Sequence, residues 1–151
     1  MTGLQPATAD YESMVRESFA KQGMMGFIGA EVTEVRPGYC EIQLPRRPEL
    51  MQQHGFMHAG ATSTIADTAG GYAAFSLFEP DDGVLTVEFK INLTAPADGE
   101  LLIARGEVIK SGRTLSITKA DVFAVKDGLE KHCAVMQQTI MRVIGRADVS
   151  G

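Results

Sequence analysis

The sequence predicts an α+β domain in which one antiparallel β-sheet curls around a single long apolar helix. Two observations carry this prediction. Residues 52–75 form a nearly continuous run of apolar and small side chains that is long enough for a helix. Four runs with the alternating pattern of β-strands follow it between residues 84 and 143. Because only one apolar helix is available to cover the sheet, the sheet must wrap around that helix.

The elements before the long helix are predicted to be one helix and one hairpin. Thr8 or Asp10 can cap an amphipathic helix that Gly23 should stop. Alternation then runs through residues 27–34 and 41–44, on either side of a Pro-Gly pair. Proline presets φ and glycine accepts the left-handed region, so this pair suits a tight turn.

The four later strands are predicted at residues 84–93, 101–109, 114–125 and 132–143. Their connections are short and contain Asp-Gly or Ser-Gly pairs, which favour tight turns. We therefore expect these strands to be antiparallel neighbours.

The size and composition of the chain indicate one domain. We expect it to span residues 1–151, with its core at about 10–144 and frayed ends. A net charge of −5, with no basic run, argues against a nucleic-acid partner. No apolar run reaches the roughly 18 residues of a membrane span, and the N-terminus does not resemble a signal peptide, so we expect a cytoplasmic protein with no membrane segment.

The two cysteines are expected to be free. Cys40 and Cys133 stand alone within alternating apolar segments, without the Cys-x-x-Cys spacing of a zinc site. Buried thiols are the prediction, and a disulfide between them is the alternative.

One carboxylate, Asp67, interrupts the long apolar helix. On a helical projection it points away from Ile65, and its face carries almost no side chains. Its neighbours on that face are Gly60, Ser63, Gly70, Gly71 and Ala74. Two adjacent glycines cost roughly 1–2 kcal/mol of helix propensity, which favours a packing or functional reason for them. Asp67 is therefore a candidate catalytic acid, with a structurally hydrogen-bonded buried acid as the alternative.

The helix also sets the geometry of any site that uses its start. If the helix begins near His58, Asp67 lies nine residues further on, a rise of roughly 13 Å. The positive end of the helix dipole favours developing negative charge, so the amides there are candidate donors to an oxyanion. One chain cannot bring Asp67 to its own helix start, whereas two antiparallel helices related by a twofold axis can.

Several segments together resemble one known family. They are residues 55–60, Ala66-Asp67, Gly71-Tyr72-Ala73, residues 87–93 and residues 110–115. This pattern resembles the hotdog fold, and specifically the PaaI-like (phenylacetic-acid-type) acyl-CoA thioesterases, over residues 10–144. The resemblance implies hydrolysis of an acyl-CoA to a free acid and coenzyme A. It also implies a homodimer or a dimer of dimers with active sites at the subunit interface.

The resemblance assigns roles to individual residues. Asp67 matches an acid that acts as general base or nucleophile. His58 and Ala59 match a histidine and glycine at the helix start, where the amides of Ala59 and Gly60 would receive the thioester oxygen. Thr86 matches a hydroxyl that orients water or the acid. No cofactor is implied, because coenzyme A is part of the substrate.

Two positions depart from the family pattern. Ala59 replaces the first glycine of the common His-Gly-Gly sequence, which keeps the backbone amide but narrows the allowed backbone angles. Gln52 stands where the family often has asparagine six residues before the histidine, and its longer arm could hold the same water or carbonyl.

Two further groups are candidates for substrate binding. Residues around the helix start could line the mouth and acyl part of a pocket, although core packing is the alternative for the apolar ones. The turn with Arg113 could contact coenzyme A phosphates, or it could be a solvated hairpin. The candidates are Gln53, His54, Gly55, Phe56, Met57, Lys110, Ser111, Gly112 and Arg113.

Three other functions fit the same residues less well: a metal site, a hydratase and a non-catalytic acyl-CoA sensor. His54 and His58 have the spacing of a zinc pair, but no glutamate follows the first histidine and Asp67 lies too far along, so we predict no metal. A hotdog hydratase would pair the acid with a histidine five residues later, where this chain has Tyr72. A non-catalytic acyl-CoA sensor would need an effector segment, and the chain has no room for a DNA-binding one.

Overall fold

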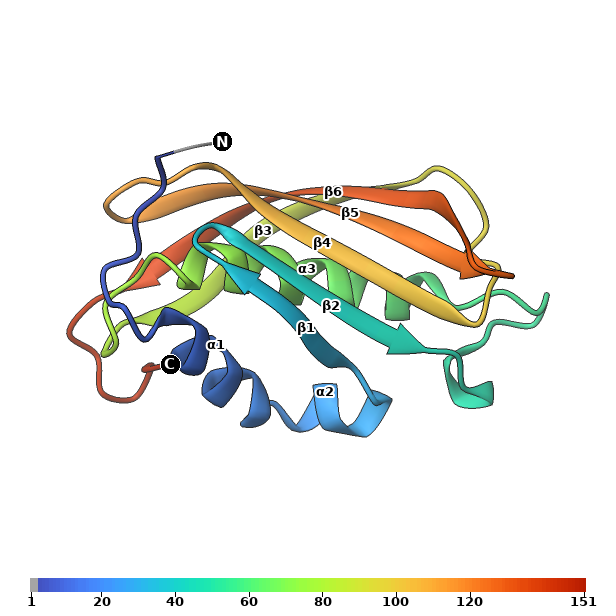
Figure 1. Cartoon of the computed structure of the whole chain (residues 1–151), viewed down its shortest axis with the longest axis horizontal. Helices are drawn as coiled ribbons and strands as arrows, with labels where there is room; N and C mark the ends of the chain where they lie inside the picture. The colour runs from blue at the N-terminus through green and yellow to red at the C-terminus, as the bar shows by residue number, and fades with distance from the viewer. Residues whose placement is uncertain (1–2) are drawn as a thin grey trace.

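The computed structural model describes residues 3–151 and confirms the predicted layout, with one sheet curled around one helix (Figure 1). The sheet is antiparallel, with the strand order β1-β2-β4-β5-β6-β3. Its strands are β1 (Glu31–Arg36), β2 (Tyr39–Pro45), β3 (Gly83–Leu93), β4 (Leu101–Lys110), β5 (Leu115–Lys126) and β6 (Leu129–Val143). The helices are α1 (Tyr11–Ala20), α2 (Gly23–Ile28) and α3 (Ala59–Phe75), with a 3₁₀ turn η1 (Pro48–Leu50).

The inner face of the sheet packs closely on α3. Ile65, Ala66 and Ala69 of the helix are fully buried against it. Gly106 on β4 permits this approach, because a Cβ there would lie 2.3 Å from the carbonyl oxygen of Ala69. Small residues on both elements therefore set the distance between helix and sheet.

Both cysteines are free and buried, as predicted. Burial raises the pKa of the Cys40 thiol to about 12. Burial also raises the pKa of Cys133. Both groups are thus protonated thiols near neutral pH and poor nucleophiles.

The N-terminal prediction needs three corrections. Gly23 does not only stop the first helix; it opens a second, six-residue helix, α2, which takes up the first part of the expected strand. Asp10 is the N-cap of α1 but makes no side-chain cap, and Thr8 accepts the amide of Asp10 and no amide within the helix. The hairpin turn itself is confirmed, with Gly38 at φ 77°.

The position of β3 also differs from the prediction. The Asp98-Gly99 connection does not join neighbouring strands, because β3 pairs with β6 whereas β4 pairs with β2 and β5. β3 is therefore an edge strand. Its register with β6 shifts between Thr86 and Glu88. Such bulges are common beside functional sites.

The C-terminal tail, which we expected to fray, returns to the body of the protein. The amide of Gly151 donates to the carbonyl of Asp82, and Lys21 Nζ donates to the carbonyl of Gly151 at 2.8 Å. The tail thereby links the end of the chain to α1. Within residues 3–151, no helix has both the length and the apolar character needed to cross a membrane.

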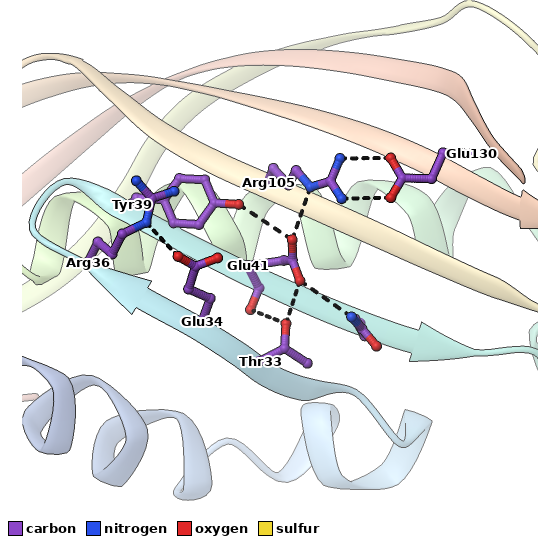
Figure 2. Close-up of polar contacts among 8 residues, drawn as sticks. Thr33, Glu34, Arg36, Tyr39, Glu41, Arg105 and Glu130 are labelled. Carbon is purple, nitrogen blue, oxygen red and sulfur yellow. Dashed lines mark hydrogen bonds and ion pairs between the residues drawn. The ribbon is translucent and has the colours of Figure 1, made fainter. Parts of the chain in front are cut away.

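A polar network covers the outer face of β2 and β4 (Figure 2). Arg105 donates to Glu41 at 3.0 Å and to both carboxylate oxygens of Glu130 at 2.7 and 2.8 Å. Partial burial acts to raise the pKa of Glu41, but hydrogen bonds from Arg105, Thr33 and Gln43 outweigh it and lower the pKa. The hydrogen bond from Arg105 lowers the pKa of Glu130.

Replacing Arg105 by methionine should destabilise the fold by about 1–2 kcal/mol at pH 7, because Glu41 loses its cationic partner while staying partly buried. The two lowered pKa values mean that these carboxylates stabilise the fold above their ordinary pKa of 4.5. That contribution is lost as the pH falls through their folded pKa values. Urea unfolding at pH 7 and in acid should show a smaller acid dependence in the variant. Arg146→Met, at an exposed ion pair, is the control, and an equal shift there would contradict the assignment.

Candidate active site

The first half of the site is the start of α3. His58 is the N-cap, and its Nδ1 accepts the amide of Gly60 at 2.7 Å. The Gly60 amide, predicted as an oxyanion donor, is thus already engaged. The amide of Ala59, the first residue of the helix, has no acceptor among residues 3–151. The start of α3 therefore offers one free backbone donor.

A large cavity of about 570 Å³ opens at this helix start. Its lining includes Gln52, Phe56, Met57, Ala59, Thr62 and Cys133. The side-chain oxygen of Gln52 accepts the amide of His54. This bond engages the carbonyl end of the Gln52 amide, and the NH₂ group makes no hydrogen bond with residues 3–151.

The second half of the site is the carboxylate of Asp67, which is half-buried. Its Oδ1 accepts a hydrogen bond from Thr86 Oγ1 at 2.7 Å and one from Gln138 Nε2 at 2.8 Å. Oδ2 accepts none from the described part of the chain. The two hydrogen bonds to Oδ1 therefore hold the carboxylate in one orientation, and Oδ2 remains available to accept a proton.

Gln138 is a member of this site that the sequence analysis missed. It lies on β6, is 1% exposed, and accepts a hydrogen bond from Thr118 at 3.0 Å. Its Nε2 also donates to the backbone carbonyl of Asp67 at 3.0 Å. The available signal was the inward alternation of Met136, Gln138 and Ile140, which places an amide at a core position.

The same glutamine explains one of the two helical glycines. A Cβ on Gly70 would lie 1.6 Å from Gln138 Oε1. Gly70 and Ala74 are buried. The face around Asp67 is therefore less open than predicted: β6 covers part of it.

The two halves of the site are separate within one chain. Asp67 borders a small recess of about 120 Å³, the Asp67 hollow, which is lined by Gln22, Thr68, Gly71, Tyr72, Val84 and Thr86. None of these residues lines the large cavity. Asp67 lies eight residues after Ala59 in α3, which corresponds to a rise of roughly 12 Å.

The other predicted substrate-binding residues do not all gather at the large cavity. Phe56 and Met57 line it, whereas residues 53–55 form an exposed turn outside it. The turn at residues 110–113 lies at the end of the sheet near the C-terminus of α3, far from the helix start. Two hydrogen bonds show this: Val108, just before the turn, donates to Gly38, and Gly38 donates to Ser76, just after the end of α3. Within one chain, the structure does not bring that turn to the helix start.

A metal site or a hydratase site would use other side chains. Among the described residues, no set of three or more His, Cys, Asp or Glu side chains is placed to hold a metal ion. The Tyr72 hydroxyl, at the position where a hydratase would carry histidine, is bonded to Ser18 at 3.1 Å and to Gln22 at 2.9 Å. Burial raises the pKa of Tyr72, so it stays neutral.

Comparisons with known proteins agree with the fold and identify the family of this chain. The pattern of the thioesterase superfamily matches residues 54–131. A 1,4-dihydroxy-2-naphthoyl-CoA hydrolase of Listeria monocytogenes is 27% identical over 118 residues, which cover 78% of this chain and 94% of that protein.

Two solved structures have the same fold as this chain over most of its length. A thioesterase family protein from Silicibacter pomeroyi has 49% sequence identity and a TM-score of 0.88, over 89% of this chain and 99% of that one. The PaaI protein from the phenylacetic acid degradation operon of E. coli is 16% identical, with a TM-score of 0.79 over 89% of this chain and 94% of that one. This second likeness concerns the fold, and the hotdog fold expected from the sequence is confirmed.

Proposed function

Since this chain belongs to the thioesterase superfamily, we propose that it hydrolyses an acyl-coenzyme A thioester to a carboxylic acid and free coenzyme A. One observation carries the proposal: α3 presents an amide at Ala59 and a carboxylate oxygen at Asp67 that have no hydrogen-bond partner among residues 3–151. Thioester hydrolysis needs a donor for the developing oxyanion and a base or nucleophile. The proposal requires no metal or further cofactor.

Asp67 acts as the base in this proposal. Thr86 and Gln138 hold Oδ1, so Oδ2 takes a proton from an attacking water. The water oxygen bonds to the carbonyl carbon, the carbon–sulfur bond breaks, and the proton passes to the departing sulfur. The alternative is attack by Oδ2 itself, which gives an anhydride that water then opens. Both routes use the same oxygen.

The donors at the helix start stabilise the oxyanion. The Ala59 amide lies at the positive end of α3, and Gln52 lines the same large cavity, so its NH₂ group is the second proposed donor. Because Nδ1 of His58 accepts the Gly60 amide, a neutral His58 carries its proton on Nε2. That proton can be donated to the substrate. Gly60 thus supports the site by holding His58.

A homodimer joins the two halves. β3 is an edge strand of eleven residues, and its Leu85, Val87, Phe89 and Leu93 are each between 45% and 56% exposed. Long apolar edges of this kind pair with another strand. We place β3 of a second copy antiparallel to it, so that each Asp67 faces the partner's Ala59. The same twofold axis turns the partner's Arg113 end toward the large cavity, where it is the proposed phosphate contact.

Gln138 positions Asp67, and Gln138→Met tests this. The variant keeps the size of the side chain but removes the amide, so kcat should fall roughly 10- to 100-fold with KM changed less than about twofold. Thr118→Val should lower kcat less, because it frees the Gln138 amide to rotate. Gln137→Met, exposed on the same strand, is the control. A purely structural glutamine would lower thermal stability without this separate fall in kcat.

The function itself is tested by a thiol-release screen over short, medium, long and aromatic acyl-CoA thioesters. We expect turnover of at least one class that depends on enzyme concentration and releases one thiol for each acid formed. Binding of these thioesters without release would instead indicate an acyl-CoA-binding protein.

A further inference from the structure

Thr62 carries a hydroxyl group that makes no hydrogen bond with residues 3–151, although the residue is only 1% exposed. The other hydroxyls in this part of α3 are engaged within the helix. Each donates to the backbone carbonyl four residues earlier, at 2.7 Å from Ser63, 2.7 Å from Thr64 and 2.9 Å from Thr68. Thr62 departs from this pattern.

The free hydroxyl of Thr62 has a local cause. The carbonyl of His58, four residues earlier, already accepts the amide of Ala61 at 2.9 Å and the amide of Thr62 itself at 3.2 Å. A buried hydroxyl without a partner is destabilising. Thr62 lines the large cavity, so a molecule bound there can supply the missing partner. The unpaired hydroxyl of Ser116 lines neither the large cavity nor the Asp67 hollow and has no such access.

The position of Thr62 sets how far its partner lies from the reacting carbonyl. This step rests on the proposed function, in which the thioester oxygen lies at the Ala59 amide. Thr62 follows Ala59 by three residues on the same side of α3, a rise of roughly 4.5 Å. Both residues line the large cavity. The group that Thr62 binds therefore lies about one helical turn from the carbonyl.

The thiol arm of coenzyme A carries an amide at this distance. From the thioester carbon the arm runs through sulfur and two methylene groups to the amide nitrogen, and four bonds of an extended chain span roughly 5 Å. Every coenzyme A thioester has this amide, whereas acyl groups share no polar atom beyond the carbonyl. The other buried residues of the cavity wall are Met57, Ala97 and Cys133, whose side chains offer an amide no strong hydrogen-bond partner.

We propose that the Thr62 hydroxyl forms a hydrogen bond with the coenzyme A amide nearest the sulfur. A hydroxyl can donate to the carbonyl of that amide or accept from its N–H. The thiol arm is then held at two points, with the thioester oxygen at Ala59 and the amide at Thr62. This orients the carbonyl carbon toward the partner's Asp67. Thr62 is thus a substrate-binding residue that recognises the constant part of the substrate.

The test compares two thioesters of an acid that the thiol-release screen identifies. One carries N-acetylcysteamine, which keeps this amide, and the other carries 1-pentanethiol, which has the same chain length without it. Thr62→Val keeps the shape of the side chain and removes the hydroxyl. Its kcat/KM should fall about 5- to 10-fold on the N-acetylcysteamine thioester, the effect of one hydrogen bond, and less than about twofold on the pentanethiol thioester.

Two control variants separate the hydroxyl from packing. Thr62→Ser keeps the hydroxyl and should keep the wild-type ratio of kcat/KM between the two thioesters. Thr64→Val is the same change one position further from the cavity wall residue Thr62 than Ser63, at a hydroxyl already bonded to the carbonyl of Gly60, and should also leave the ratio unchanged. Equal losses on both thioesters in Thr62→Val would overturn the contact.

Binding of S-ethyl-CoA, a thioether that cannot be hydrolysed, separates this inference from the proposed function. Thr62→Val should raise the dissociation constant about 5- to 10-fold, and Thr62→Ser should raise it less than about twofold, whether or not any thioester is hydrolysed. An unchanged dissociation constant in Thr62→Val would overturn the contact, and turnover in the thiol-release screen would still leave the proposed function standing.

Discussion

Asp67→Asn should lower kcat by roughly 10³-fold while the dimer and its melting temperature stay close to wild type. The loss follows from the chemistry, because an amide oxygen cannot take the proton from water and general bases contribute about 10²- to 10⁴-fold. The fold is kept because asparagine still accepts the hydrogen bonds that Thr86 and Gln138 donate to Oδ1.

Steady-state thiol release and thermal unfolding measure both parts of this expectation. Asp81→Asn is the matched control, since Asp81 is an exposed acid in the turn after α3. If Asp67→Asn kept wild-type turnover, Asp67 would not be the catalytic acid.

Ala59→Pro should lower kcat by roughly 10²- to 10³-fold, the range for loss of one oxyanion donor. The substitution removes the backbone N–H and little else. Ala59 is the first residue of α3, where proline is well tolerated. His58 has φ −64° and ψ 141°, the extended conformation that a residue before proline requires.

The comparison variant is Ala59→Gly, which keeps the N–H. The kcat of Ala59→Pro should be roughly 10²- to 10³-fold below that of Ala59→Gly. Circular dichroism should give similar melting temperatures for the two variants. Equal kcat values in the two variants would show that the Ala59 amide does not bind the oxyanion.

The sequence predicted the parts of the fold that local pattern determines. The long helix, the Pro-Gly turn and the six strands followed from periodicity and turn residues. The short helix α2 did not, because six residues with two glycines carry no helical pattern. The placement of β3 beside β6 depends on contacts between residues far apart in the chain, which no local pattern contains.

Some residues of the candidate site could likewise be identified from local sequence, and others could not. Asp67 was identifiable as one acid in an apolar helix, and the resemblance also pointed to Thr86, which donates a hydrogen bond to Asp67. Gln138 was not identified, because its contact with Asp67 spans 71 residues. The use of the Gly60 amide by His58 depends on a side-chain rotamer, and sequence does not encode that locally.

The central claim is that each active site combines Asp67 of one chain with Ala59 of the other, and mixing two inactive variants tests it most directly. When Asp67→Asn and Ala59→Pro chains are unfolded together and refolded, heterodimers contain one site with both changes and one intact site. We predict recovery of about a quarter of wild-type activity, since half of the dimers are mixed and each has one working site of two. Activity that stays at the level of the separate variants, with mixed dimers demonstrated by mass, would contradict a shared site.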